Sequence, residues 1–130
     1  MLRLARGWWA SDGSEDYFDR VEEILDTDPS KVPELIRAMV DTAPEGRLAR
    51  IGTGPVETLQ MAMEFGWRET PTTMELVLAA ELTPAELFGV LKGAYPNYIV
   101  DMDVARWTAG ILTAEQVAWL SKPGGQGRYE

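Results

Sequence analysis

Apolar residues in this 130-residue chain recur every three or four positions, in short runs that are separated by prolines and glycines. Such a spacing is typical of α-helices that bury one face. Alternation of apolar and polar residues, which is typical of strands, is confined to the short segment Tyr98-Ile99-Val100. We therefore expect an all-α protein, folded as an irregular orthogonal bundle of roughly six to eight short helices.

Residues that begin helices divide the chain into these segments. Thr83 and Thr113 each have the spacing of a capping box, in which a threonine and a Glu or Gln three residues later bond each other's backbone amides. Ser14, Ser30 and Thr70 are the other expected caps. The predicted helices cover residues 14–28, 30–42, 47–51, 55–65, 71–81, 84–94, 97–109 and 114–120.

These helices are expected to bury one core, in a single domain over residues 1–120. The predicted core consists of apolar residues on the inward faces, namely Phe18, Val21, Leu25, Leu35, Ile36, Met39, Ile51, Leu59, Leu78, Leu87, Leu91 and Trp107. Residues 121–130 read Ser-Lys-Pro-Gly-Gly-Gln-Gly-Arg-Tyr-Glu, which is the composition of a flexible tail.

The chain has no cysteine and no histidine. It therefore lacks the residues for thiol nucleophiles, for Cys or His zinc sites, for Ser-His-Asp triads and for imidazole acid–base chemistry. Asp26, Asp28, Asp101 and Asp103 do not have the spacing of a calcium loop. We predict no catalytic residue, no metal site and no cofactor, and hence a protein that is not an enzyme.

The sequence has no signal-peptide run and no apolar stretch near the roughly 20 residues of a membrane span. We expect a cytoplasmic protein that does not bind membranes. Its formal net charge is −9, from 21 acidic and 12 basic residues. An average surface of this sign repels nucleic acid and favours a basic partner.

Negative charge is concentrated on the back of the first predicted helix, at Asp16, Asp19, Glu22, Glu23 and Asp26. This acidic face is either a solvated helix back or a docking surface for a basic protein. In the second case it would accelerate the partner's approach by electrostatic steering.

Five tryptophans are many for a chain of this length, and Trp8 and Trp9 are adjacent. Neighbouring positions on a helix point about 100° apart, so it is difficult to bury both rings completely. We expect at least one of them to be exposed as an anchor for a partner, because tryptophan is enriched among binding hot spots. The alternative is that both rings fill the core.

Gly52-Thr53-Gly54-Pro55 is expected to form a sharp turn between two helices. Gly52 or Gly54 would take a positive φ, and Pro55 suits the first position of the helix that follows. Glu57 would lie in the first turn, where its charge is favourable for the helix dipole. Backbone amides at such a helix start can hold an anion, so this turn is a second candidate site.

The segments Asp28-Pro29, Ala43-Pro44 and Ile51-Gly-Thr-Gly-Pro-Val-Glu-Thr-Leu59 resemble a family of small bacterial all-helical domains of unknown function. The family features are an acidic first helix, a second helix after Asp-Pro, an Ala-Pro turn and an Ile-Gly-x-Gly-Pro-x-Glu-x-Leu motif. The resemblance extends from residue 16 to about residue 59. It implies a helical fold and no particular activity.

Residues 82–120 show a second resemblance, to helix-turn-helix regulators. Leu82-Thr-Pro-Ala-Glu-Leu87 and Val104-Ala-Arg-Trp-Thr-Ala-Gly110 are similar to the two ends of such a module, which implies DNA binding. Asp101 and Asp103 would lie in the recognition helix, where base and phosphate contacts call for Arg, Lys, Asn or Gln. An inactivated module that serves packing or homodimer formation fits these carboxylates better.

Together these patterns favour a non-enzymatic bacterial interaction protein, of the immunity-protein or inhibitor type, that docks a basic partner through its acidic N-terminal helix. Two alternatives stay open. A helix-turn-helix-derived transcriptional or phage regulator would bind duplex DNA with strong salt dependence. A domain that binds a small molecule or an anion would use the Gly-Thr-Gly-Pro turn.

Overall fold

The computed structural model describes residues 1–11, 15–94 and 102–121, and of Glu15 and Asp16 it describes the backbone alone. All regular structure in these ranges is helical, which confirms an all-α bundle of short helices. The elements in chain order are α1 (Leu2–Ala10), α2 (Glu15–Thr27), the 3₁₀-helix η1 (Pro29–Lys31), α3 (Val32–Thr42), α4 (Ala49–Ile51), the π-helix η2 (Gly52–Val56), α5 (Glu57–Glu64), α6 (Thr73–Ala79), α7 (Pro84–Leu91), α9 (Val104–Trp107) and α10 (Ala114–Leu120).

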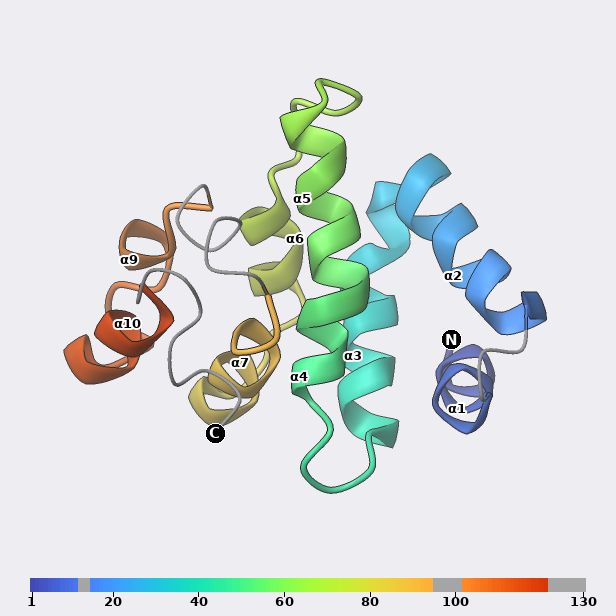
Figure 1. The fold of residues 1–130 in the computed structure, drawn as a ribbon, viewed down its shortest axis with the longest axis horizontal. Coiled ribbons are helices and arrows are strands. Elements are labelled where there is room, and N and C mark those ends of the chain that lie inside the picture. The colour runs from blue at the N-terminus through green and yellow to red at the C-terminus, as the bar shows by residue number, and fades with distance from the viewer. Residues whose placement is uncertain (12–14, 95–101, 122–130) are drawn as a thin grey trace.

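The helices follow one another along the long axis of the molecule. Figure 1 shows α1 and α2 at one end, α3 to α7 in the middle, and α9 and α10 at the other end. Helix α3 is central, because α1 and α6 both pack against it. The buried apolar side chains form one core cluster that extends from α1 to α10.

Most of the predicted core residues are buried in this cluster. Phe18, Leu78 and Trp107 are the exceptions, since each is only partly buried at the edge of the core. Phe65, the last residue of the helix expected over 55–65, is 61% exposed. The physical reason is that α5 ends at Glu64 and Gly66 turns the chain with a φ of 75°, so Phe65 lies beyond the packed part of the helix.

Helix α1 forms where we expected no helix, and it explains the adjacent tryptophans. Its Ala5 and Trp8 are buried, and the helix packs against α3. Trp9 is partly buried, and its indole Nε1 donates a 2.8 Å hydrogen bond to the carbonyl oxygen of Met39. Neither tryptophan is fully exposed, because a backbone acceptor on α3 lets the second ring pack against the core as well.

The expected turn at Gly52-Thr53-Gly54-Pro55 is also wrong. Helix α4, η2 and α5 form one uninterrupted helical stretch (Figure 1), and Gly52 has right-handed helical angles of φ −64° and ψ −47°. In an α-helix the ring of an interior proline clashes with the carbonyl four residues earlier. The wider π-turn accommodates Pro55 here, and the Glu57 amide donates to the Gly52 carbonyl oxygen five residues back.

Two glycines serve close packing between helices. A Cβ on Gly52 would overlap the carbonyl oxygen of Val90, and a Cβ on Gly93 would overlap the carbonyl group of Ala49. The start of the long helical stretch thus lies backbone against backbone on the end of α7. The hydroxyl of Thr53 adds a 2.7 Å hydrogen bond to the carbonyl oxygen of Gly93.

Both predicted capping boxes are confirmed. At the start of α7, the Thr83 amide donates to the carboxylate of Glu86 at 2.9 Å, and the Thr83 hydroxyl accepts from the Glu86 amide at 3.1 Å. Thr113 and Gln116 make the same pair of bonds at the start of α10, which spans the predicted residues 114–120.

Two other helix starts differ from the expectation. Thr72 caps α6 in place of Thr70, because the Thr72 hydroxyl accepts from the Glu75 amide at 3.1 Å. Ser30 lies in η1 and its hydroxyl donates to Asp28, so it does not cap α3.

Three predictions fall wholly or partly outside the described residues. They concern the cap at Ser14, residues 97–101 of the helix expected over 97–109, and the tail, of which only residue 121 is described. Of that expected helix, α9 accounts for Val104–Trp107.

Candidate partner-binding surface

The acidic face of α2 is a row of exposed carboxylates, which belong to Asp19, Glu22, Glu23 and Asp26. Asp16 lies in the same helix, and its side chain is outside the described part of the structure. The opposite face of α2 is anchored in the core by Val21 and Leu25, which are 2% and 3% exposed. The apolar side of the helix therefore orients the acidic side toward solvent.

None of the four carboxylates forms an ion pair with a residue that the structure describes. Acidic residues on α3 and α7 behave differently. Asp41 and Glu86 both pair with Arg37, at 2.6 Å and 3.0 Å. The acidic face of α2 is thus a concentration of charge that the described fold leaves unneutralised.

Asp19, Glu22 and Asp26 share one side of α2, because helix positions three and seven residues apart lie within about 60° of each other around the axis. Although the Glu22 side chain is exposed, neighbouring atoms partly desolvate its carboxyl. This desolvation, and then the charges of Asp26 and Asp19, raise the pKa of Glu22 above its ordinary value. The ionised form of this carboxyl is therefore disfavoured in the free protein. A cation placed beside these three groups would relieve the repulsion.

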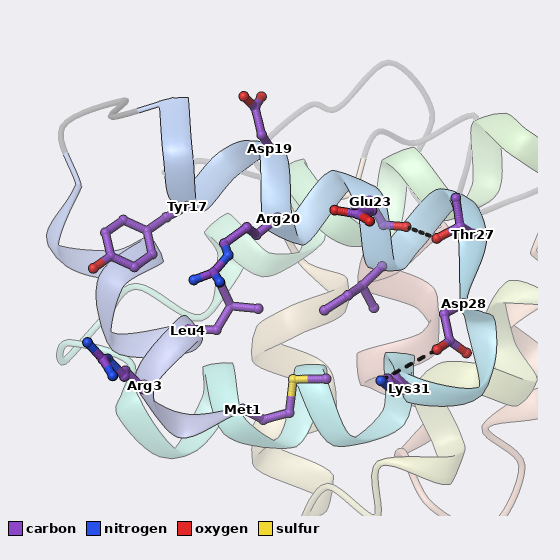
Figure 2. A pocket seen from close by; sticks show the side chains of 11 residues that line it. Met1, Arg3, Leu4, Tyr17, Asp19, Arg20, Glu23, Thr27, Asp28 and Lys31 are labelled. Carbon is purple, nitrogen blue, oxygen red and sulfur yellow. Dashed lines mark hydrogen bonds and ion pairs between the residues drawn. The ribbon is translucent and has the colours of Figure 1, made fainter.

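An open groove of about 960 Å³ runs beside this face, between α1, α2 and η1 (Figure 2). Met1, Leu4 and Ile24 give it an apolar part. Its charged lining has both signs and consists of Arg3, Asp19, Arg20, Glu23, Asp28 and Lys31. The groove is therefore amphipathic and mixed in charge.

The charged side chains around the groove point in different directions. Figure 2 shows Arg20 reaching from α2 over the groove toward Leu4, while Asp19 points outward from the rim. Lys31 pairs with Asp28 at 3.7 Å. On α2, Arg20 thus lies over the groove, whereas Asp19 is directed away from it.

Gly7 permits the close contact between α1 and α2 at one end of the groove. A Cβ at this position would overlap the ring of Tyr17, which lies directly on the α1 backbone and lines the groove. The placement of the acidic helix therefore depends on α1, the helix that we did not expect.

Not all of the predicted site residues belong to this surface. Trp8 is buried and Trp9 is partly buried between α1 and the core, so neither ring projects from the acidic face of α2. Sequence reasoning also missed Arg3, Arg20 and Lys31 as groove residues. Their place beside the groove is apparent only when residues 2–10 are read as a helix that packs against α2.

The candidate anion site is not built as expected. Within a continuous helix the backbone N–H groups of residues 52–54, 56 and 57 are directed at carbonyl groups of the preceding turn, and Pro55 has none, so they do not converge on a ligand. Gly52 and Pro55 are buried, and Glu57 is only 7% exposed. Gly54 has open space near it, with the Trp8 ring 3.7 Å from the place of a Cβ.

The segments that resemble a helix-turn-helix module give short helices. Helix α9 has four residues, and Asp103 precedes it with a left-handed φ of 54°. A single helical turn presents few side chains to a major groove. Within residues 1–11, 15–94 and 102–121, no group of three or more acidic residues is placed to hold a metal ion. No helix among them has the length and apolar character needed to cross a membrane.

Comparisons with protein-family models, with curated proteins and with solved structures give no match to this chain. The resemblances to the bacterial helical family and to helix-turn-helix regulators stay predictions.

Proposed function

We propose that this chain is a non-enzymatic interaction module of the inhibitor or immunity-protein type, and that it binds a basic protein through the acidic face of α2. One observation carries the proposal, namely four exposed carboxylates on a single helix with no ion pair among the described residues. A buried apolar face fixes this helix, so a partner would meet a preformed surface.

Electrostatics gives this surface two roles. The net charge of −9 attracts a basic partner over a distance of about one Debye length, roughly 8–10 Å at physiological salt. At contact, cationic side chains of the partner would pair with Asp19, Glu22 and Asp26. Covering the basic surface of a nucleic-acid-binding protein in this way would block its access to nucleic acid.

The adjacent groove adds apolar contact area. Met1, Leu4 and Ile24 line it beside the charged residues, and interfaces combine an apolar centre with a polar rim in this way. A partner side chain that entered the groove would fix the position of the complex, while the carboxylates would mainly set its rate of formation.

Capture from native lysate with two matched variants tests the proposal. The first variant neutralises the face with Asp19→Asn, Glu22→Gln, Glu23→Gln and Asp26→Asn. The control removes the same charge from exposed positions elsewhere, with Glu45→Gln, Glu69→Gln, Glu75→Gln and Glu115→Gln. We expect the wild type and the control to retain the same basic protein at low salt and to release it at high salt, and the first variant to lose it. Equal retention by both variants, or no basic protein on the wild type, would refute the proposal.

A further inference from the structure

Gln60 is a buried polar side chain that makes no hydrogen bond to the described residues. It lies on α5 and is 5% exposed. Its carboxamide carries two N–H donors and one oxygen acceptor, and none of them has a side-chain or backbone partner in the described chain. Native proteins pair the large majority of their buried polar groups, so an unpaired amide at this depth requires an explanation.

A cavity of about 230 Å³ lies against Gln60, between α5, α6 and α9. Its apolar walls come from soft or aromatic side chains, namely Met63, Met74, Met102 and Trp107. Sulfur and indole groups of this kind pack well against the faces of a planar ring. The volume is several times the roughly 30 Å³ of one water molecule, and it is enough for a ligand with a single ring.

The other polar groups of the wall are already engaged. The Thr72 hydroxyl accepts from the Glu75 amide at 3.1 Å. The Thr73 hydroxyl accepts from Arg68 at 3.2 Å and donates to the sulfur of Met63 at 3.4 Å. Among the described residues of the wall, Gln60 is therefore the polar side chain that has no hydrogen bond or ion pair.

The described residues of the cavity rim carry no net charge. Asp103 and Arg106 both line it, and their charged groups lie 4.0 Å apart. The guanidinium of Arg106 also lies 5.5 Å from the ring centre of Trp107. This balance disfavours a ligand of either charge and suits a neutral one.

We propose that this cavity binds a small, neutral, planar molecule with an N–H donor beside a carbonyl oxygen, as in a primary carboxamide or a cyclic amide. Gln60 bonds that edge through its own donor and acceptor, and the methionines and Trp107 contact the ring. The proposal concerns a different part of the molecule from the acidic face of α2, and it does not depend on the function of that face.

Nicotinamide and 2-pyridone are suitable probes, and nicotinate is the matched control because it has the same ring as nicotinamide with a charged carboxylate in place of the amide. Titrations at millimolar concentration are followed by NMR of the Gln60 side-chain amide and the Trp107 indole. We expect saturable shifts with both amides and binding at least about ten-fold weaker with nicotinate. Asp103→Asn makes the rim positive and should therefore reduce the difference in affinity between nicotinamide and nicotinate.

Gln60→Leu provides the second readout, since leucine has a similar size and no unpaired polar atoms. Without a probe this variant should unfold at a higher temperature than the wild type. Nicotinamide should raise the unfolding temperature of the wild type and leave that of the variant unchanged. The proposal is overturned if the amide probes give no shifts in the wild type, if the shifts persist in Gln60→Leu, or if Gln60→Leu lowers the unfolding temperature.

Discussion

Replacing Gly52 and Gly54 by alanine, one at a time, separates a role in helix packing from a role in a turn. Both lie in the helical stretch from α4 to α5, and neither has a positive φ. At an open helical position alanine is more stable than glycine by roughly 0.5–1 kcal/mol. Gly54 is open toward the other helices, where the nearest atom to its Cβ would be a Trp8 ring carbon at 3.7 Å, but the ring of Pro55 disfavours a helical residue with a Cβ before it and offsets this gain.

Gly52 is the opposite case. Its new methyl group would overlap the carbonyl oxygen of Val90, which belongs to the backbone of α7 and cannot rotate away. The two helices would have to separate by roughly 1 Å, which weakens the packing contacts around them. Overpacking of this kind costs about 1–3 kcal/mol. We therefore expect Gly52→Ala to lower the free energy of unfolding by about 1–3 kcal/mol and Gly54→Ala to change it by less than about 0.5 kcal/mol.

Urea unfolding followed by circular dichroism measures both changes. Gly52→Ala should be the less stable of the two variants by about 1–3 kcal/mol. A turn with a positive φ at Gly54 predicts that Gly54→Ala is the more destabilising substitution. That result, or equal effects of the two substitutions, would refute the packing explanation.

Four further substitutions test the electrostatics and the packing of the fold. Glu22→Gln removes like-charge contacts at i,i+3 and i,i+4 and should stabilise the chain by roughly 0.4–1 kcal/mol near neutral pH. Because the pKa of Glu22 is raised in the folded protein, the stability of the wild type falls as the pH rises through that pKa. Thermal unfolding at several pH values should show a smaller fall in the variant. Glu86→Gln should cost about 1–2 kcal/mol at neutral pH. The hydrogen bonds from Arg37 hold the pKa of Glu86 below its usual range, so this contribution is lost as the pH falls through the folded pKa, and unfolding curves of variant and wild type should converge in acid. Trp9→Phe leaves a backbone acceptor on α3 without its indole donor and should lower the free energy of unfolding in urea by about 1–3 kcal/mol. As a comparison, Trp67→Ser replaces a side chain that is 77% exposed and should change the free energy of unfolding by less than about 0.5 kcal/mol.

Local signals predicted the parts of the fold that local chemistry determines. The capping boxes at Thr83 and Thr113 each need residues within one helical turn, and both form as expected. The spacing of Val21 and Leu25 likewise orients α2, so the exposure of its acidic face follows from the sequence.

The errors occur where residues distant in the sequence decide the structure. Two glycines and a proline have the same local pattern in a turn as in a tightly packed helix, and the deciding groups at Val90 and Gly93 lie about 40 residues away in the chain. Trp9 is similar, because its indole donor is satisfied by a carbonyl 30 residues away. The cavity at Gln60 combines three separate helices, and no spacing in the sequence indicates it.

The affinity of the captured basic protein for the two four-fold variants tests the central claim most directly. Isothermal titration gives this affinity for the wild type, the variant without the acidic face of α2 and the control that has lost the same charge elsewhere. Exposed ion pairs contribute about 0.2–1 kcal/mol each, so losing four should weaken binding by roughly 1–4 kcal/mol, or at least about five-fold. We predict that loss for the first variant, a much smaller change for the control, and circular dichroism spectra that match the wild type for both. An unchanged affinity in the first variant, or the same loss in both, would contradict the assignment of α2 as the binding surface.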